Sequence, residues 1–205
     1  MPVSTSRHER AQQTRGRICA AAKELFLGQG YDATTISEIA KTAGVAHQTV
    51  YFVFGSKAAV LAAVMDAEIV GDLDPVPLLQ RPEVARIAGV TDPARRLRRV
   101  VALAVGVTER LAPVYEIVRG GAADADVRDL LDRHEEQRWR SLRELVALVV
   151  DDLGGALGAD DAADLLYALL SHDVYWLLVR RRGWSAARWR QYVTDEACRQ
   201  LLAVG

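Results

Sequence analysis

Proline is scarce and clustered in this sequence, and this constrains the fold more than any other feature. Four of the six prolines, Pro75, Pro77, Pro82 and Pro93, lie close together, and only Pro113 interrupts a long run of helix-forming residues. Proline ends or kinks helices, and the alternation of apolar and polar residues that marks strands is absent. Ala, Leu, Arg and Glu dominate elsewhere, and all four favour helix. The sequence therefore predicts an all-α protein.

The N-terminal part of the chain carries clear helix signals. Thr35, followed three residues later by Glu38, forms the pattern of a capping box, in which each side chain accepts a bond from a free backbone N–H group. Gly44 should end that helix, and Ser56 can cap a later one. The predicted helices cover approximately residues 10–27, 36–43, 47–52 and 56–70.

Longer helices are predicted in the remainder. Asp92 is a candidate N-cap with Pro93 in the first turn, and Pro113 should kink the helix that follows. Glycines at 120–121, 154–155 and 183 mark the breaks between the later helices. These helices are predicted over residues 94–119, 124–152, 160–182 and 185–203.

Charge is unevenly distributed. Residues 1–57 carry seven Lys/Arg and four Asp/Glu, a balance of +3, whereas the rest of the chain has a balance of −4. A basic N-terminal part fits contact with a polyanion, although a difference of this size is also common by chance. Cys19 and Cys198 lack ligand-like spacing, so both are expected to be small buried hydrophobes. With no signal peptide and no run approaching roughly 20 apolar residues, a soluble, cytoplasmic protein without membrane contact is expected.

Residues 34–57, TTISEIAKTAGVAHQTVYFVFGSK, have the pattern of a helix-turn-helix. In that motif the first helix contacts the phosphate backbone and the second enters the major groove of DNA. Gln48 could hydrogen-bond an adenine edge, His47 a guanine, and Thr49 could meet a thymine methyl group or a phosphate. Val50 should face inward. His47 could equally be an ordinary surface histidine.

The combined pattern over residues 17–61 resembles the tetracycline-repressor (TetR) family of bacterial regulators. The residues that carry the resemblance are Ile18, Ala22, Leu25-Phe26, Gly30-Tyr31, Thr34-Thr35, Ile39-Ala40, Ala43-Gly44-Val45, Thr49-Val50-Tyr51, Phe54, Ser56-Lys57 and Leu61. The resemblance implies a helix-turn-helix DNA-binding domain over residues 8–57 and an effector-binding and dimerisation domain over residues 58–205.

The resemblance also implies where DNA is bound. Tyr51 and Lys57 match positions that contact phosphates, and Thr35 caps the second helix beside the backbone. The candidate DNA-binding residues are Arg17, Thr35, Ser37, Ala46, His47, Gln48, Thr49, Tyr51 and Lys57. Two departures stand out: Ala46 replaces a capping residue, which should cost about 1 kcal/mol, and Val53 replaces a common His or Tyr.

In proteins of this family the last two helices pair with a second copy, and an effector occupies a cavity in the C-terminal domain. The implied partners are therefore a double-stranded DNA operator, a small-molecule effector and a second copy of the chain. The candidate effector-binding residues are Tyr115, Trp139, Tyr167, His172 and Trp176, each of which could instead belong to the core. The candidate dimer-interface residues are Leu166, Leu170, Val174, Leu177, Trp189, Val193 and Leu201.

These observations favour a ligand-responsive repressor, and two alternatives remain. An activator or a protein that binds dispersed DNA sites could use the same fold. An enzyme is disfavoured: His134-Glu135-Glu136 and His172-Asp173 are the only suggestive clusters, and no two histidines have the i, i+4 spacing of a helical zinc site. No catalytic residue, cofactor or metal is expected.

Overall fold

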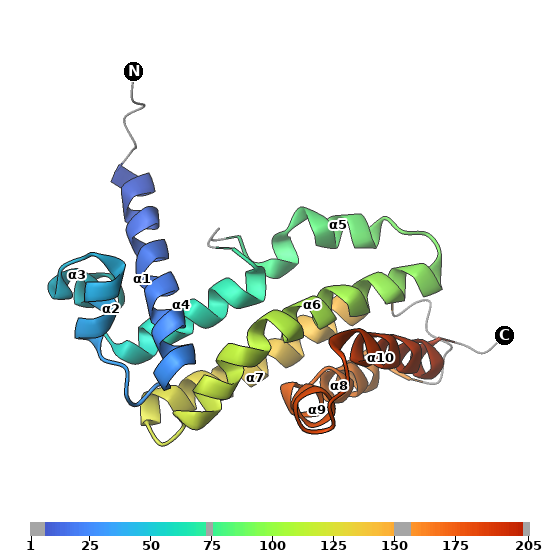
Figure 1. Ribbon diagram of the computed structural model, residues 1–205. Helices are drawn as coiled ribbons and strands as arrows, with labels where there is room; N and C mark the ends of the chain where they lie inside the picture. Colours follow the sequence, from blue (N-terminus) through green and yellow to red (C-terminus); the bar gives the residue numbers. More distant parts are fainter. Residues whose placement is uncertain (1–6, 73–75, 150–156, 203–205) are drawn as a thin grey trace. The chain divides into compact units, whose positions relative to one another are not determined.

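The computed structural model describes residues 7–72, 76–149 and 157–202, and these residues are almost entirely helical (Figure 1). They form two compact units. Unit 1 comprises residues 1–74 and 113–132, and unit 2 comprises residues 75–112 and 133–205. The all-α prediction is confirmed. The proposed division of function at residues 57 and 58 stays a prediction.

Unit 1 begins with four helices whose positions agree with the sequence signals. Helix α1 packs against both α2 and α4, and α2 packs against α3. Ile18, Phe26, Ile39, Val50 and Leu61 are almost fully buried among these helices, so the apolar faces read from the sequence form one core. The bounds are α1 (Arg7–Gln29), α2 (Ile36–Ala43), α3 (His47–Phe54) and α4 (Lys57–Val70).

The proline-rich stretch contains two short elements that the sequence did not predict, η1 (Leu78–Gln80) and α5 (Pro82–Ala88). Helix α6 (Pro93–Gly120) follows, and Asp92 caps it as predicted, since its Oδ1 accepts a bond of 2.5 Å from the Arg95 N–H. Pro113 lies inside α6, and the two units divide the helix at this residue. Helix α7 (Ala125–Val146) ends earlier than predicted, and the rest of its predicted range includes residues 150–152, outside the described residues.

The single helix predicted over residues 160–182 is wrong, because the segment is interrupted. It consists of three successive elements: α8 (Ala159–Leu169), the short helix α9 (His172–Tyr175) and a π-helical segment, η3 (Trp176–Arg181). Ser171 has an extended backbone, and its Oγ accepts a bond of 3.1 Å from the Val174 N–H, which starts a new helix. The last helix is α10 (Ala186–Leu201).

Unit 2 has its own hydrophobic core, formed by residues of α5, α6, α7, α8 and α10. Five residues predicted for a dimer interface, Leu166, Leu170, Trp189, Val193 and Leu201, are at most 2% exposed in this core. A side chain already buried in its own chain has no surface left for a partner, so this part of the interface prediction is corrected. Of the predicted set, Leu177 is 48% exposed and Val174 is partly buried.

Residues 159–181 are long and apolar enough to cross a membrane by length and composition alone, contrary to the expectation that no segment would be. Within the described residues this stretch is broken at Leu170 and Ser171, and Ala162, Ala163 and Leu166 lie in the core of unit 2. The segment therefore contributes residues to the core of unit 2, with 28% of its apolar stretch buried. Cys19 is buried as predicted, whereas Cys198 is only partly buried, and burial raises the pKa of both thiols.

Candidate nucleic-acid interface and a polar cluster in unit 2

The turn between α2 and α3 is built by local hydrogen bonds. The capping box at the start of α2 is present: the Thr35 Oγ1 accepts a bond of 3.2 Å from the Glu38 N–H, and the Glu38 carboxylate accepts one of 2.8 Å from the Thr35 N–H. Gly44 then adopts a left-handed conformation, with φ of 65°, that ends α2. Ala46 is the N-cap of α3, and because its methyl side chain has no hydrogen-bond acceptor, it makes no side-chain bond to the helix.

Helix α3 has one buried side and one exposed side. Val50 is fully buried, which confirms that it faces inward, while Ala46, His47, Gln48 and Tyr51 are exposed and Thr49 is partly buried. The His47 and Tyr51 rings contact each other edge to face, with their centroids 4.9 Å apart. A helix with one exposed side that carries hydrogen-bonding groups, such as those of His47 and Gln48, is what entry into a major groove requires.

Phe52 is the most exposed large apolar side chain on this helix, at 92%, and the sequence reasoning missed it. It follows Gln48 by four residues, so the two share a helix face. This spacing was the available signal. An exposed aromatic ring at that position could make apolar contact with a thymine methyl group. Phe54, in contrast, is partly buried beneath the Arg15 guanidinium, which lies 4.8 Å from its ring centroid.

Lys57 is held within unit 1. Its Nζ donates hydrogen bonds to the carbonyl oxygens of Tyr31 (2.8 Å) and Thr34 (3.0 Å) and lies 4.0 Å from the centroid of the Tyr31 ring. Of the three N–H donors of a lysine ammonium, two therefore bind the loop before α2. The predicted contact of Lys57 with a DNA phosphate stays a prediction, and the structure adds a second, structural role.

The other candidate DNA-binding residues lie around this motif. Arg17 on α1, Thr35 and Ser37 are all exposed. A Cβ atom built on Gly44 would lie 4.0 Å from a guanidinium nitrogen of Arg17, which places that arginine beside the turn. Unit 1 thus places Arg17 beside the turn that joins α2 to α3.

Unit 2 contains a polar cluster of His134, Glu135, Arg138, Tyr167 and His172. The Glu135 Oε2 accepts bonds from Arg138 Nε (3.1 Å), Arg138 Nη2 (3.1 Å) and the Tyr167 hydroxyl (2.6 Å). Arg138 also donates to the Tyr167 carbonyl (3.1 Å) and stacks on the Tyr167 ring, 3.7 Å from its centroid. The Glu135 orientation is therefore fixed by several contacts.

The two histidines of this cluster lie close together, with ring centroids 5.8 Å apart. His172 is only 4% exposed. Burial, and then the nearby His134 and Arg138, lower the pKa of His172 to about 3. Burial also lowers the pKa of His134. Both imidazoles are therefore neutral at pH 7.

The five candidate effector-binding residues have different surroundings. Tyr167 and His172 belong to the polar cluster, whereas the Trp139 indole N–H donates to Asp164 Oδ1 (2.6 Å). The Arg181 guanidinium lies 5.3 Å from the Trp176 ring centroid. Tyr115 is buried and belongs to unit 1. Their role in effector binding stays a prediction.

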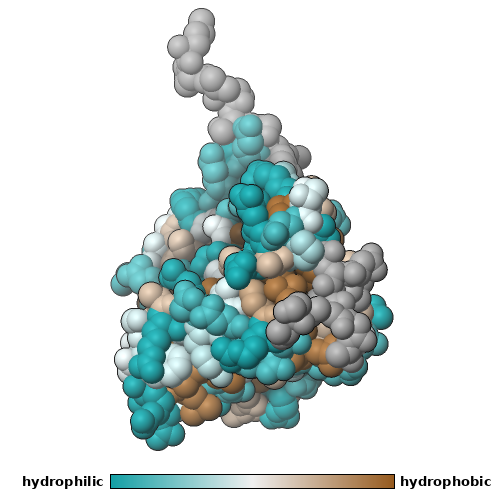
Figure 2. Space-filling model, turned by 90° about the vertical axis from the view of Figure 1, so that its right-hand side faces the viewer, coloured by the Kyte–Doolittle hydropathy of each residue, from teal (hydrophilic) through white to brown (hydrophobic). Residues whose placement is uncertain are grey.

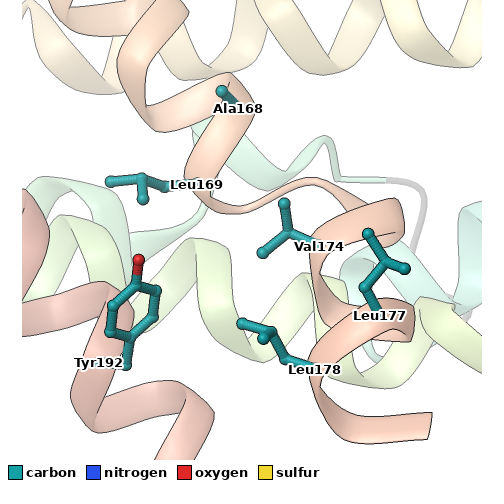
Figure 3. Close-up of a pocket in the computed structure, with 6 residues that line it drawn as sticks. All are labelled: Ala168, Leu169, Val174, Leu177, Leu178 and Tyr192. Atoms are coloured by element: carbon teal, nitrogen blue, oxygen red, sulfur yellow. The ribbon is translucent and has the colours of Figure 1, made fainter. Parts of the chain in front are cut away.

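An open apolar pocket of about 280 Å³ lies on unit 2 (Figure 3). Val174, Leu177 and Leu178 line one side of it, and Tyr192 of α10 lies across from them. Ala168 and Leu169, at the end of α8, complete the lining. Hydrophobic patches lie among hydrophilic ones on the face of the molecule seen in Figure 2.

The capped helix, the glycine turn and the exposed second helix together define a helix-turn-helix protein, a class whose members bind DNA. Residues 18–64 match the family model described as bacterial regulatory proteins, tetR family. Over these residues, which include α2 and α3, the chain is similar to the tetR family.

Relatives in sequence agree with this similarity. The chain is 39% identical over 59 residues to the HTH-type transcriptional regulator TtgR of Pseudomonas putida, a match that covers 29% of this chain and 28% of TtgR. It is 32% identical over 110 residues to an uncharacterized HTH-type transcriptional regulator of Mycobacterium bovis, covering 54% of this chain and 58% of that protein. The chain thus spans just over a quarter of the length of TtgR and less than two thirds of the mycobacterial protein.

Solved structures share the fold over nearly the whole chain. NalD of Pseudomonas aeruginosa, described as the secondary repressor of the MexAB-OprM multidrug efflux pump, is 20% identical with a TM-score of 0.67, covering 96% of this chain and all (100%) of that one. SmeT in complex with triclosan is 20% identical with a TM-score of 0.71, covering 94% of this chain and 93% of that one. At these identities the similarity establishes the fold alone.

Proposed function

We propose that the chain is a DNA-binding transcription regulator, most simply a cytoplasmic repressor that leaves a palindromic operator when a small molecule binds. The observation that carries this proposal is the exposed side of α3. His47, Gln48, Tyr51 and Phe52 face outward there, whereas Val50 anchors the helix to the core of unit 1. This arrangement supports major-groove binding by α3, with α2 against the phosphate backbone.

The active form is proposed to be a homodimer. One helix-turn-helix reads one half-site, and two copies place their recognition helices about 34 Å apart, which is one turn of DNA. The apolar pocket supports this proposal, because Val174 and Leu177 line it and an exposed apolar surface is typical of an interface. The interface is therefore proposed to use these residues and Tyr192.

The effector is proposed to be a small molecule bound by unit 2. Support comes from two proteins of the same fold, one in complex with triclosan and one, from Saccharomonospora viridis, in complex with choline. Binding would favour a conformation in which the two recognition helices no longer match the operator spacing. Triclosan and choline are the first probes to add to a preformed protein–DNA complex.

Selection of bound sequences from a random DNA pool tests the DNA-binding proposal. Wild-type protein should recover one palindromic motif, and Gln48→Ala should change the preferred base at one position of each half-site, at a cost of roughly 1–3 kcal/mol. Gln137→Ala is the matched control, because Gln137 is an exposed glutamine of unit 2 that bonds Ser141. The proposal fails if wild-type protein enriches no motif. An unchanged motif in Gln48→Ala would instead show that α3 reads DNA through other residues.

A further inference from the structure

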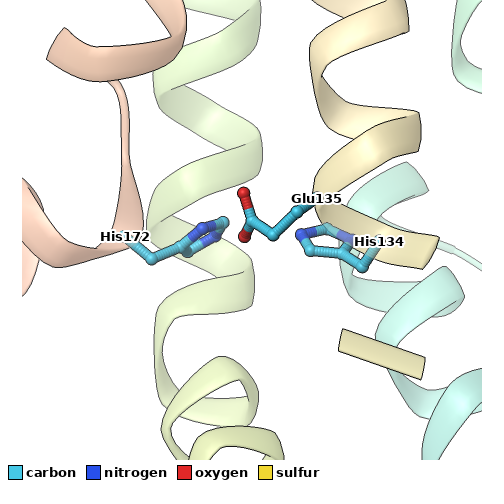
Figure 4. Close-up of side chains that lie close together, drawn as sticks. All are labelled: His134, Glu135 and His172. Atoms are coloured by element: carbon cyan, nitrogen blue, oxygen red, sulfur yellow. The ribbon is translucent and has the colours of Figure 1, made fainter. Parts of the chain in front are cut away.

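Two imidazoles and one carboxylate converge within unit 2. His134 and Glu135 come from α7 and His172 from α9, and Figure 4 shows the Glu135 carboxylate between the two rings, with all three side chains directed toward one another. One potential ligand atom from each residue lies within 4.8 Å of the other two. From this geometry we propose that His134, Glu135 and His172 bind a first-row transition-metal dication such as Zn²⁺.

The donor set selects this class of metal. Imidazole nitrogen and carboxylate oxygen suit Zn²⁺ and its late first-row neighbours, whereas Mg²⁺ and Ca²⁺ prefer oxygen ligands alone. Zn–N and Zn–O bonds of about 2.0–2.2 Å in a tetrahedron require ligand atoms about 3.3–3.5 Å apart. The present separation of up to 4.8 Å therefore requires a contraction of about 1.5 Å at most, which side-chain rotations can supply.

The surroundings hold the ligands in place. The Arg138 and Tyr167 bonds to Glu135 all use its Oε2 atom, and a carboxylate has about four lone-pair sites over its two oxygens. The buried Thr108 hydroxyl lies 3.1 Å from the Leu170 carbonyl, at the break between α8 and α9 that positions His172. Hydrogen bonds made directly to a ligand side chain, as Arg138 and Tyr167 make to Glu135, orient metal ligands in known sites.

Three protein ligands leave one tetrahedral position open. In zinc proteins such a position holds water or a bound molecule, whereas purely structural sites have four protein ligands. His134 and Glu135 are only partly buried, but His134 Nε2 and both ring nitrogens of His172 are buried, so a metal or a small molecule reaches the site only when these side chains move. A metal here would thus provide a point to which an oxygen, nitrogen or sulfur atom of a small molecule could bind. The site is independent of the DNA-binding proposal, because it lies in unit 2.

Zinc titration of the full chain, produced without a histidine tag and stripped with EDTA, tests the proposal. Competition against a chromophoric chelator should give one Zn²⁺ per chain. Glu135→Gln and His172→Asn should each weaken zinc binding at least about 10- to 100-fold. Loss of a group that only orients a ligand already weakens metal binding by this factor, and loss of a ligand should weaken it at least as much. Glu136→Gln should bind as wild type does, because Glu136 is the next residue on α7, is exposed and pairs with Arg140 (2.8 Å).

A measurement on the wild-type chain keeps the test decisive if a variant fails to fold. X-ray absorption at the zinc edge of the loaded protein should show two imidazoles with one or two oxygen ligands. The proposal is overturned if the wild-type chain binds no zinc at micromolar concentration. It is equally overturned if folded variants bind zinc as tightly as Glu136→Gln does, or if the absorption spectrum lacks two imidazoles.

Discussion

Replacing Lys57 by methionine should destabilise unit 1. Methionine keeps the length and apolar stem of the side chain but removes the ammonium that bonds the carbonyl oxygens of Tyr31 and Thr34 at 2.8 and 3.0 Å. Hydrogen bonds to charged groups contribute about 1.5–3 kcal/mol each when buried, and a cation–π contact at an exposed site about 0.5–1 kcal/mol. The low ends of these ranges sum to about 3.5 kcal/mol for the two bonds and the ring contact. Since Lys57 is only partly buried, solvent weakens these contacts, and we expect a total loss of about 2–4 kcal/mol.

Urea unfolding followed by circular dichroism measures this loss, and a thermal melt should show a decrease in Tm of roughly 4–16 °C. Lys41→Met is the matched control, because Lys41 is an exposed lysine on α2, and it should change stability by less than about 1 kcal/mol. The reasoning is refuted if Lys57→Met is as stable as the wild type to within about 0.5 kcal/mol. The proposed phosphate contact is measured separately: its loss should lower the salt dependence of DNA binding by about one phosphate.

Three further changes probe the helix-turn-helix. Ala46→Ser should stabilise the chain by about 0.5–2 kcal/mol in urea unfolding, because the α3 N-cap has extended backbone and no side-chain bond; a destabilised variant would contradict this. Gly44→Ala should lower the free energy of unfolding by roughly 1–2 kcal/mol in the same assay, because a φ of 65° is strained for alanine. The added Cβ itself has room, since the nearest atom, on Arg17, is 4.0 Å away. An unchanged urea midpoint would show that the turn relaxes. The hydrogen bond from the Thr35 backbone N–H lowers the pKa of Glu38, so the stability that ionised Glu38 contributes is present at pH 7 and is lost as the pH falls through that lowered pKa. Glu38→Gln should therefore be less stable than the wild type at pH 7, and the difference in unfolding free energy between the two should become smaller in acid. A difference that does not change with pH would argue against the capping box.

Local signals in the sequence determined much of unit 1. The capping box at Thr35 and Glu38, the break at Gly44 and the inward side of Val50 all appear in the structure as predicted. These features depend on residues within a few positions of each other, and the cost of an uncapped helix end or a strained turn is set locally. Phe52 could have been found in the same way, from its spacing to Gln48.

Tertiary structure decided the rest. Helical periodicity shows that Leu166, Leu170 and Trp189 lie on apolar faces, but the hydrophobic effect has no direction and does not say whether the chain itself or a partner covers such a face. Whether Lys57 also bonds the loop before α2, and whether His172 meets His134 and Glu135, depends on how helices distant in sequence pack. Side-chain groups interact over a few ångströms, so contacts between separate helices exist only once the fold has brought them together.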